Sequence, residues 1–285
     1  MLIMKKIILL LLCMAALLMS GCGDKFAKEK EEIIKAEKAA MAMQLPALVK
    51  PDNFKKPSPT KEEKAQYKAD LNKLIDVEKK MLAEMQKSDE QISALLAKAA
   101  DESEKKDLLA FKDKVRRERI SFVKKISQDR LCGDTFIVGV GSTWQEVEMI
   151  YGQPTDKGKK LLGSKEYKYG GLKFEDWIGG GVPPLNILKK WVSKTVQCVT
   201  LTGSDITSDA GIRIGMTRDE AYKVLKSKYV NKTNNPARNE MKIDRSKKED
   251  GFDMVVYFAM KDTEPFHMFL EFKEGKLTRY SVAPN

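Results

Sequence analysis

Histidine is almost absent from this chain, since His267 is the only one among 285 residues. The four cysteines form no Cys-x-x-Cys pair, and a single histidine cannot make a His-x-x-x-His pair. The sequence also lacks a Gly-x-Ser-x-Gly elbow and a phosphate-binding loop. Zinc sites, serine hydrolases and nucleotide-binding proteins usually carry one of these patterns. The sequence therefore predicts no metal, no cofactor and no catalytic residues.

A run long enough to span a membrane is missing as well. The apolar stretch from Ile7 to Met19 has 13 residues, whereas a bilayer-spanning helix needs about 20. Two lysines precede it and Ser20-Gly21-Cys22 follows it, which are the parts of a secretory signal. The end of this segment resembles the lipobox of bacterial lipoproteins. That resemblance implies removal of residues 1–21 and modification of Cys22 with diacylglycerol and palmitate. An ordinary signal peptide with an incidental cysteine and an uncleaved anchor are the alternatives.

The residue after Cys22 bears on localisation. In diderm lipoproteins, an aspartate directly after the lipidated cysteine is the signal for retention in the inner membrane, and this chain has Gly23 there. The resemblance therefore implies a cell-envelope protein held at the membrane through the lipid on Cys22. If the organism is diderm, it implies the outer membrane, with the protein facing the periplasm.

Charge of one sign is not concentrated in any part of the chain. Lys and Arg number 52 against 41 Asp and Glu, and loss of Lys5 and Lys6 with the signal lowers the net charge from +11 to +9. Nucleic-acid binders usually gather their positive charge on one face, so no nucleic-acid partner is expected. The densest basic run predicts the solvated side of a helix, or a contact with anionic headgroups or cell-wall polymers. This run comprises Lys112, Lys114, Arg116, Arg117, Arg119, Lys124 and Lys125.

Only two cysteines remain in the mature chain, because Cys13 leaves with the signal and Cys22 takes the lipid. An exported compartment permits disulfides, and closing a loop of this length stabilises a fold by about 4 kcal/mol in the chain-entropy model. We expect a structural bridge between Cys132 and Cys198, with two buried free thiols as the alternative.

Residues 22–60 are predicted to be a lipidated tether and linker. Apolar residues recur at helix-like spacing up to Met41, and four prolines between Pro46 and Pro59 then prevent a continuous helix. Such a stretch suits a connection between a lipid and a folded body.

Residues 61–131 are predicted to form a helical hairpin or a coiled coil. Thr60 and Glu63 make a capping box, so a helix should begin near Lys61. Apolar residues then recur every three or four positions on one stripe, which needs a partner helix to bury it. A break is expected at a second capping sequence that begins at Ser88, or in the apolar-free stretch from Asp101 to Asp107.

Residues 132–203 and 204–285 are predicted to be two tandem repeats. Three residues of the first, Gly141, Thr143 and Glu146, recur in the second at an offset of 74 residues, as Gly215, Thr217 and Glu220. Each set predicts a short β segment, a glycine turn, and a helix that begins at a Thr–Glu capping box. Strand-like segments follow each helix, so each repeat should be one helix packed on a small antiparallel sheet.

These motifs resemble a known family. The Gly-x-Thr-x-x-Glu-Val helix start, the Tyr151-Gly152-x-Pro154 helix end and the strands after them are similar to outer-membrane assembly lipoproteins of the BamE/SmpA type. The tandem arrangement is similar to the β-lactamase-inhibitor-protein fold, in which two such units lie side by side. The resemblance covers about residues 136–285. The second repeat lacks the Gly-x-Pro end, and residues 61–131 have no counterpart in either family.

An apolar insertion, residues 177–191, interrupts the strands of the first repeat and is rimmed by lysine. Exposed apolar patches with aromatic anchors often mark interfaces, so residues that bind a partner are expected here. The alternative is that the segment folds back as a short helix and covers the sheet. The candidate residues are Trp177, Leu185, Ile187, Leu188 and Trp191.

Together these patterns predict an α+β protein in which a helical hairpin or coiled coil precedes two tandem helix-on-antiparallel-sheet repeats. They favour a lipid-anchored cell-envelope protein that is not an enzyme and acts as a protein-interaction or scaffolding module with an envelope protein as its partner. The alternative is a ligand-binding protein or an enzyme that acts on cell-wall or lipid fragments, which would need a pocket lined by convergent polar groups. A third hypothesis is a coiled-coil spacer between membrane and wall.

Overall fold

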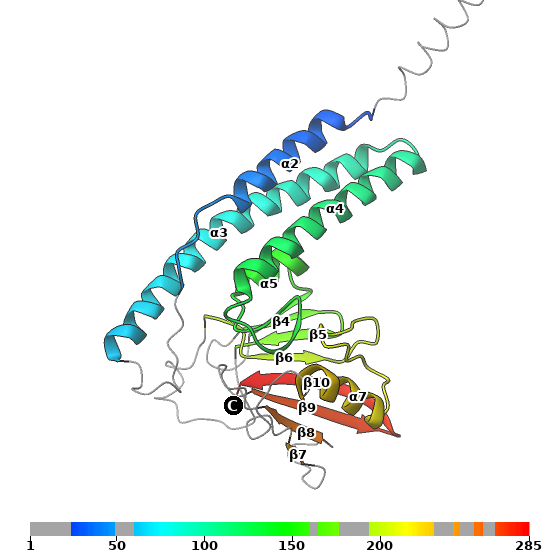
Figure 1. Cartoon of the computed structure of the whole chain (residues 1–285). Helices are drawn as coiled ribbons and strands as arrows, with labels where there is room; N and C mark the ends of the chain where they lie inside the picture. Colours follow the sequence, from blue (N-terminus) through cyan, green and yellow to red (C-terminus); the bar gives the residue numbers. More distant parts are fainter. Residues whose placement is uncertain are drawn as a thin grey trace, which may run out of the picture. The chain divides into compact units, whose positions relative to one another are not determined.

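Figure 1 shows the computed structural model of the chain. It describes residues 24–48, 60–159, 165–176, 194–230, 242–244, 254–258 and 266–284. The chain forms two compact units. The helical unit consists of Met1–Ala42 and Glu84–Val115, and the sheet unit consists of Met43–Ala83 and Arg116–Asn285.

The long helices are α2 (Ala27–Met41), α3 (Lys61–Lys98) and α4 (Glu102–Ser127). The predicted start of α3 is confirmed, because Thr60 Oγ1 accepts a hydrogen bond from the Glu63 N–H and Glu63 Oε2 accepts one from the Thr60 N–H. No helix in the described residues is both long and apolar enough to cross a bilayer.

The break between α3 and α4 falls at residues 99–101 and so reaches the start of the stretch from Asp101 to Asp107 that lacks apolar residues. The Asp101 carboxylate accepts a hydrogen bond from the Glu104 N–H at 2.8 Å and so begins α4. The other expected break point is not used, since α3 continues through Ser88. Ser88 bonds to the Glu84 carbonyl within the helix instead of capping a new one.

The helical unit is built around a small apolar core to which α2, α3 and α4 all contribute. Its buried members are Phe26, Ile33, Ile92, Leu95, Leu108, Phe111 and Val115. The helix-like spacing noted up to Met41 corresponds to α2, which packs in this core through Phe26 and Ile33. This spacing reflects one buried face of α2. Phe26 and Ile33 lie on this face and pack against the apolar side of the α3–α4 pair.

The sheet unit contains ten strands among the described residues. They are β1 (Cys132–Phe136), β2 (Val138–Val140), β3 (Asp156–Lys159), β4 (Lys165–Tyr169), β5 (Leu172–Glu175), β6 (Cys198–Leu201), β7 (Lys242–Asp244), β8 (Met254–Phe258), β9 (Phe266–Lys273) and β10 (Lys276–Pro284). β1 and β2 form a two-stranded antiparallel pair. The other eight form one antiparallel sheet in the order β3-β4-β5-β6-β10-β9-β8-β7. The predicted α+β class is confirmed.

One face of the large sheet carries the core of this unit. Side chains alternate along each strand, so Phe174 and Leu172 of β5, Leu201 of β6 and Tyr280 of β10 share one face and are fully buried. Phe136 of β1 packs on Tyr280 from that side, with ring centroids 6.4 Å apart. This apolar face holds the β1–β2 pair against the sheet.

Two short helices, α5 (Trp144–Tyr151) and α7 (Arg218–Leu225), begin in the same way. Each starts at a complete capping box, made by Thr143 with Glu146 in α5 and by Thr217 with Glu220 in α7. Their ends differ. α5 stops at Gly152, which has φ +74°, whereas α7 runs on into a π-helical turn, Lys226–Val230, at the place where the sequence lacks the Gly-x-Pro end.

A glycine turn precedes each of these helices and hydrogen-bonds to a later part of the same predicted repeat, just before β6 in the first and at the start of β10 in the second. The Gly141 N–H donates to the Val196 carbonyl at 2.9 Å, and the Gly215 N–H donates to the Leu277 carbonyl at 2.8 Å. Both glycines have φ values above +90°, a region that glycine adopts without a steric penalty.

Candidate functional site

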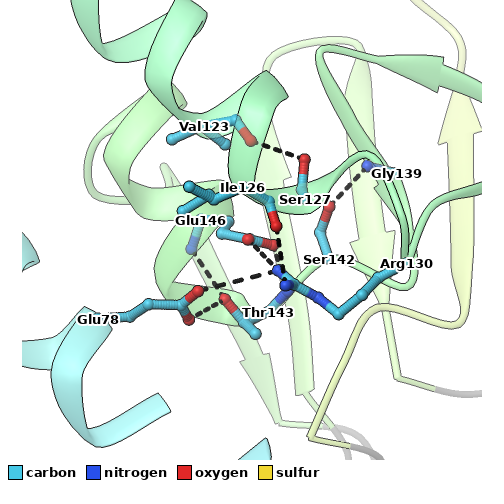
Figure 2. Close-up of polar contacts among 9 residues, drawn as sticks. All are labelled: Glu78, Val123, Ile126, Ser127, Arg130, Gly139, Ser142, Thr143 and Glu146. Carbon is cyan, nitrogen blue, oxygen red and sulfur yellow. Dashed lines mark hydrogen bonds and ion pairs between the residues drawn. The ribbon is translucent and has the colours of Figure 1, made fainter. Parts of the chain in front are cut away.

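A group of buried ionisable side chains lies in the sheet unit. Figure 2 shows Glu78 of α3, Arg130 after α4 and Glu146 of α5 pointing toward one another, with the hydroxyl of Thr143 beside them. We call these four residues the carboxylate cluster. Glu78, Thr143 and Glu146 have no exposed surface, and Arg130 is 6% exposed.

The capping box of α5 fixes half of the carboxylate cluster. Glu146 Oε2 accepts a hydrogen bond from the Thr143 N–H at 2.9 Å, and Thr143 Oγ1 accepts one from the Glu146 N–H at 3.2 Å. The other oxygen, Glu146 Oε1, pairs with the guanidinium of Arg130. Arg130 is itself held by a 3.0 Å bond from its guanidinium to the Ile126 carbonyl at the end of α4.

Glu78 is the second carboxyl of the carboxylate cluster. Its Oε2 accepts a 2.6 Å hydrogen bond from the Thr143 hydroxyl, and its Oε1 lies 3.9 Å from Arg130. One guanidinium cannot neutralise two buried carboxylates, so one of the two must hold a proton. Burial, followed by repulsion from Glu146, raises the pKa of Glu78 to about 8. Glu78 is therefore mostly protonated at neutral pH.

This geometry suits holding elements together more than reacting with a substrate. A general acid must reach the atom that it protonates, and none of the carboxyl oxygens of the carboxylate cluster is open to solvent. The cluster joins the first half of α3 to the end of α4 and to the start of α5. The raised pKa of Glu78 makes that junction sensitive to pH.

A second buried carboxyl, that of Asp134, joins β1 to the loop before α7. It accepts hydrogen bonds from the Tyr280 hydroxyl at 2.9 Å and from the Ala210 N–H at 2.8 Å. The pKa of Asp134 is raised because burial outweighs these bonds and one from Ser208. Asp134 is 1% exposed, so it too is placed to support the fold.

On the face of the large sheet opposite the apolar core, strands β3 to β6 carry polar side chains. Near the β3 edge this face carries a cross-strand series of alternating charges, in which Lys168 Nζ lies 2.8 Å from Asp156 and 3.1 Å from Glu166. Lys173 Nζ continues the series at 2.8 Å from Glu175. We call these five residues the charged edge. The Asp156 and Lys168 side chains are 54% and 43% exposed, whereas Glu166 and Glu175 are mostly covered.

Cys198 lies on the polar face of β6, with its Sγ 3.9 Å from Thr200 Oγ1. Burial raises the pKa of the thiol to about 11, so it is not a ready nucleophile at neutral pH. The side chain of Cys132 lies outside the described structure, and the bridge to Cys198 stays a prediction. The position of Cys198 weighs against it, because β1 packs on the opposite face of the sheet, over Tyr280.

The residues predicted to bind a partner lie in a part of the chain that the structure does not describe. The lipidation site Cys22 and all of the insertion candidates Trp177, Leu185, Ile187, Leu188 and Trp191 lie outside the described residues. The side chain of His267 also lies outside them, although its backbone belongs to β9. Trp144 is described and belongs to the core, with its ring edge-to-face on Tyr167. Within the described residues, no three His, Cys, Asp or Glu side chains converge to hold a metal ion.

Sequence reasoning did not find the carboxylate cluster. One signal was present: the apolar stripe of α3 passes from Leu74 to Met81, and Glu78 occupies a stripe position between them. A glutamate on the buried side of a helix requires a partner. Glu146 was recognised only as a capping residue, and nothing local in the sequence pairs it with Arg130.

No protein-family model, curated protein or solved structure matches this chain. The family resemblance noted from the sequence therefore rests on the motifs alone.

Proposed function

We propose that this protein is a lipid-anchored, non-catalytic interaction module of the cell envelope, and that the charged edge is part of the surface that binds a protein partner. The proposal keeps Cys22 as the lipid-bearing residue and residues 1–21 as the signal peptide. If the envelope has two membranes, the protein belongs on the outer one and faces the periplasm.

The proposal includes the tandem arrangement of repeats at 132–203 and 204–285. Strands β3 to β6 follow α5, strands β7 to β10 follow α7, and the two sets meet with β6 beside β10. The matching capping boxes of Thr143 and Thr217 and the matching glycine turns support a common origin for the two halves. A similarity of fold does not by itself carry a function across.

One observation favours binding over catalysis: Asp156 and Lys168, at the outer end of the charged edge, are open to solvent, whereas the carboxylate cluster is sealed. Lys168 and Asp156 offer charges of both signs on the neighbouring strands β3 and β4. Alternating charges at a rim select a complementary partner and speed its approach. The carboxyl groups of Glu78 and Glu146 have no exposed surface and so cannot reach a substrate.

Site-specific photo-crosslinking of the lipidated protein in its own cells tests this function. One variant carries the photoreactive residue at Lys168, and a control carries it at Lys79, which is 59% exposed on α3. We expect a discrete protein adduct from position 168 and none from position 79. A third variant combines the probe at 168 with Lys173→Glu, which reverses one charge of the series and should reduce the adduct.

Two results would contradict the proposal. Internal crosslinks alone at position 168 would show that this surface is covered within the chain. Adducts of small mass that contain lipid or cell-wall fragments would favour the ligand-binding or enzymatic alternative.

A further inference from the structure

We infer that the tip of the helical unit, where α2 begins beside the α3–α4 turn, faces the lipid headgroups, and that this unit projects outward from the membrane. The inference rests on the proposed lipid at Cys22. It adds the surface that meets the bilayer and the direction in which α3 and α4 lead away from it.

Cys22 lies very close in sequence to the folded chain. Asp24 is only two residues after Cys22, and consecutive Cα atoms are about 3.8 Å apart, so the two Cα atoms lie within roughly 8 Å. A lipid on Cys22 would therefore hold Asp24 at the membrane surface, with no tether between them.

Asp24 is fixed to the rest of the helical unit. Its Oδ1 accepts a hydrogen bond from the Phe26 N–H at 3.0 Å, and its Oδ2 lies 2.9 Å from Lys30 Nζ. Lys30 also pairs with Asp107 of α4, and the Phe26 ring is 5% exposed in the apolar core. The start of α2 therefore cannot move away from α4 without breaking buried contacts.

The end of the α3–α4 pair that lies beside the start of α2 is the α3–α4 turn. Lys25 Nζ is 3.2 Å from Glu104 Oε2, and the same carboxylate accepts a hydrogen bond from the Ala100 N–H at 2.7 Å. Glu104 belongs to the first turn of α4, directly after the α3–α4 turn. Figure 1 shows α2 beginning near this turn. The turn is therefore the part of the unit that Cys22 brings to the headgroups.

The orientation of the helical unit on the bilayer follows from where its apolar side chains lie. A helix that lies flat in the interface needs a broad apolar face directed at the lipid. Leu109, at 52%, is the only large apolar side chain that is strongly exposed in the described residues. The apolar residues of α2 and of the α3–α4 pair are used in the core instead. The helical unit therefore stands on its tip, and α3 and α4 lead from the bilayer toward the interior of the envelope compartment.

Depth-dependent fluorescence quenching tests this orientation in the full, lipidated chain. A single fluorophore is attached at Ser103→Cys near the tip, or at Lys114→Cys on the same side of α4, in a background with Cys132→Ala and Cys198→Ala. Both labelled positions are exposed. The proteins are reconstituted into phosphatidylcholine vesicles that contain a headgroup-linked spin-label quencher. We expect at least about twofold stronger quenching at 103, because eleven residues of helix separate the sites by roughly 16 Å.

A matched variant removes the geometric constraint without removing the lipid. Ten Gly and Ser residues inserted between Gly23 and Asp24 give the chain a reach of roughly 17 Å, so the contrast between the two positions should shrink while the protein stays bound. Cys22→Ala tests the anchor separately and should abolish vesicle binding.

Two results would overturn the orientation and leave the anchor intact. Equal strong quenching at 103 and 114 would mean that the unit lies flat, and weak quenching at both in vesicle-bound protein would mean that the tip points away. If Cys22→Ala binds vesicles as the parent does, the lipid anchor itself is refuted, and the orientation with it.

Discussion

Thr200 of β6 and Ser281 of β10 face each other directly across the central strand pair, with their hydroxyl oxygens 3.0 Å apart. Both residues are almost completely buried. The Thr200 hydroxyl is therefore the close partner of the Ser281 hydroxyl on this face, and Thr200 has the Cys198 thiol beside it as a weaker second partner at 3.9 Å. The pair lies where the strands that follow α5 meet the strands that follow α7. The pair therefore lies at the boundary between the two proposed repeats.

The hydroxyl pair should be energetically coupled. Thr200→Val or Ser281→Ala alone leaves one buried hydroxyl without its partner, which we expect to cost about 1–2 kcal/mol of unfolding free energy. The double variant removes both groups and should cost less than the sum of the single changes by about 1 kcal/mol. Urea unfolding followed by tryptophan fluorescence measures all four proteins. Additive effects would show that the two hydroxyls do not depend on each other.

The Glu78 carboxyl should make the sheet unit less stable as the pH rises. Its pKa is raised to about 8 in the folded chain from 4.5, so the folded state binds more protons than the unfolded state between these values. Stability should therefore fall as the pH rises from about 4.5 to 8, with a slope of at most about 1.4 kcal/mol per pH unit. Glu78→Gln is neutral at every pH and should remove this part of the slope.

The matched control for this change is Glu220→Gln. Glu220 has the same place in the capping box of α7 as Glu146 has in α5, but no surrounding structure buries it. Its pKa is lowered by the Thr217 N–H, so this group acts in the opposite direction. When the unfolding free energy is plotted against pH from 5 to 9, the Glu220→Gln variant and the parent should give parallel lines. A Glu78→Gln protein that keeps the full slope of the parent would place the titrating group elsewhere.

The two turn glycines should respond very differently to a methyl group. Gly141 and Gly215 have nearly the same positive φ, but a Cβ at Gly141 would meet the Arg130 carbonyl oxygen at 2.1 Å, and one at Gly215 would meet nothing within 4 Å. Gly215→Ala should therefore cost only the strain of its backbone conformation, about 1 kcal/mol. Gly141→Ala should cost at least about 3 kcal/mol, because backbone must shift beside the carboxylate cluster.

Thermal unfolding of the two alanine variants provides the comparison. If Gly141→Ala is too unstable to purify, its soluble yield relative to Gly215→Ala gives the same ranking. Equal stabilities would mean that the close approach of Arg130 to Gly141 is relaxed in solution.

Local signals in the sequence predicted much of the fold. The capping residues Thr60, Thr143 and Thr217 stand next to the helices that they start, and the largely apolar sequence of β9 was recognised as a strand. The edge strands β3 and β7 were missed, because Asp156–Lys159 has no apolar alternation and is a strand only through its pairing with β4.

The carboxylate cluster could not be predicted in the same way. Glu78 and Glu146 are 68 residues apart in the sequence, and their meeting depends on how α3 packs on the start of α5. A glutamate on an apolar stripe indicates that a partner exists, but only the tertiary fold identifies it. The burial of α2 was missed for a related reason, since its apolar face looks the same whether it packs or stays exposed.

Asp209 should hold a strained turn in place. Ile137 has φ +74°, a conformation that costs a β-branched residue roughly 1–2 kcal/mol, and Asp209 Oδ2 accepts its N–H at 3.1 Å while also bonding to the Thr135 hydroxyl. Gly211, 74 residues later, also has a positive φ and adopts it without strain. Asp209→Ala should therefore cost about 2 kcal/mol in the parent and about 1 kcal/mol less in an Ile137→Gly background, where the turn forms without the carboxylate. A double-mutant cycle by urea unfolding measures this coupling, and a cost that is the same in both backgrounds would mean that Asp209 acts only through its other contacts.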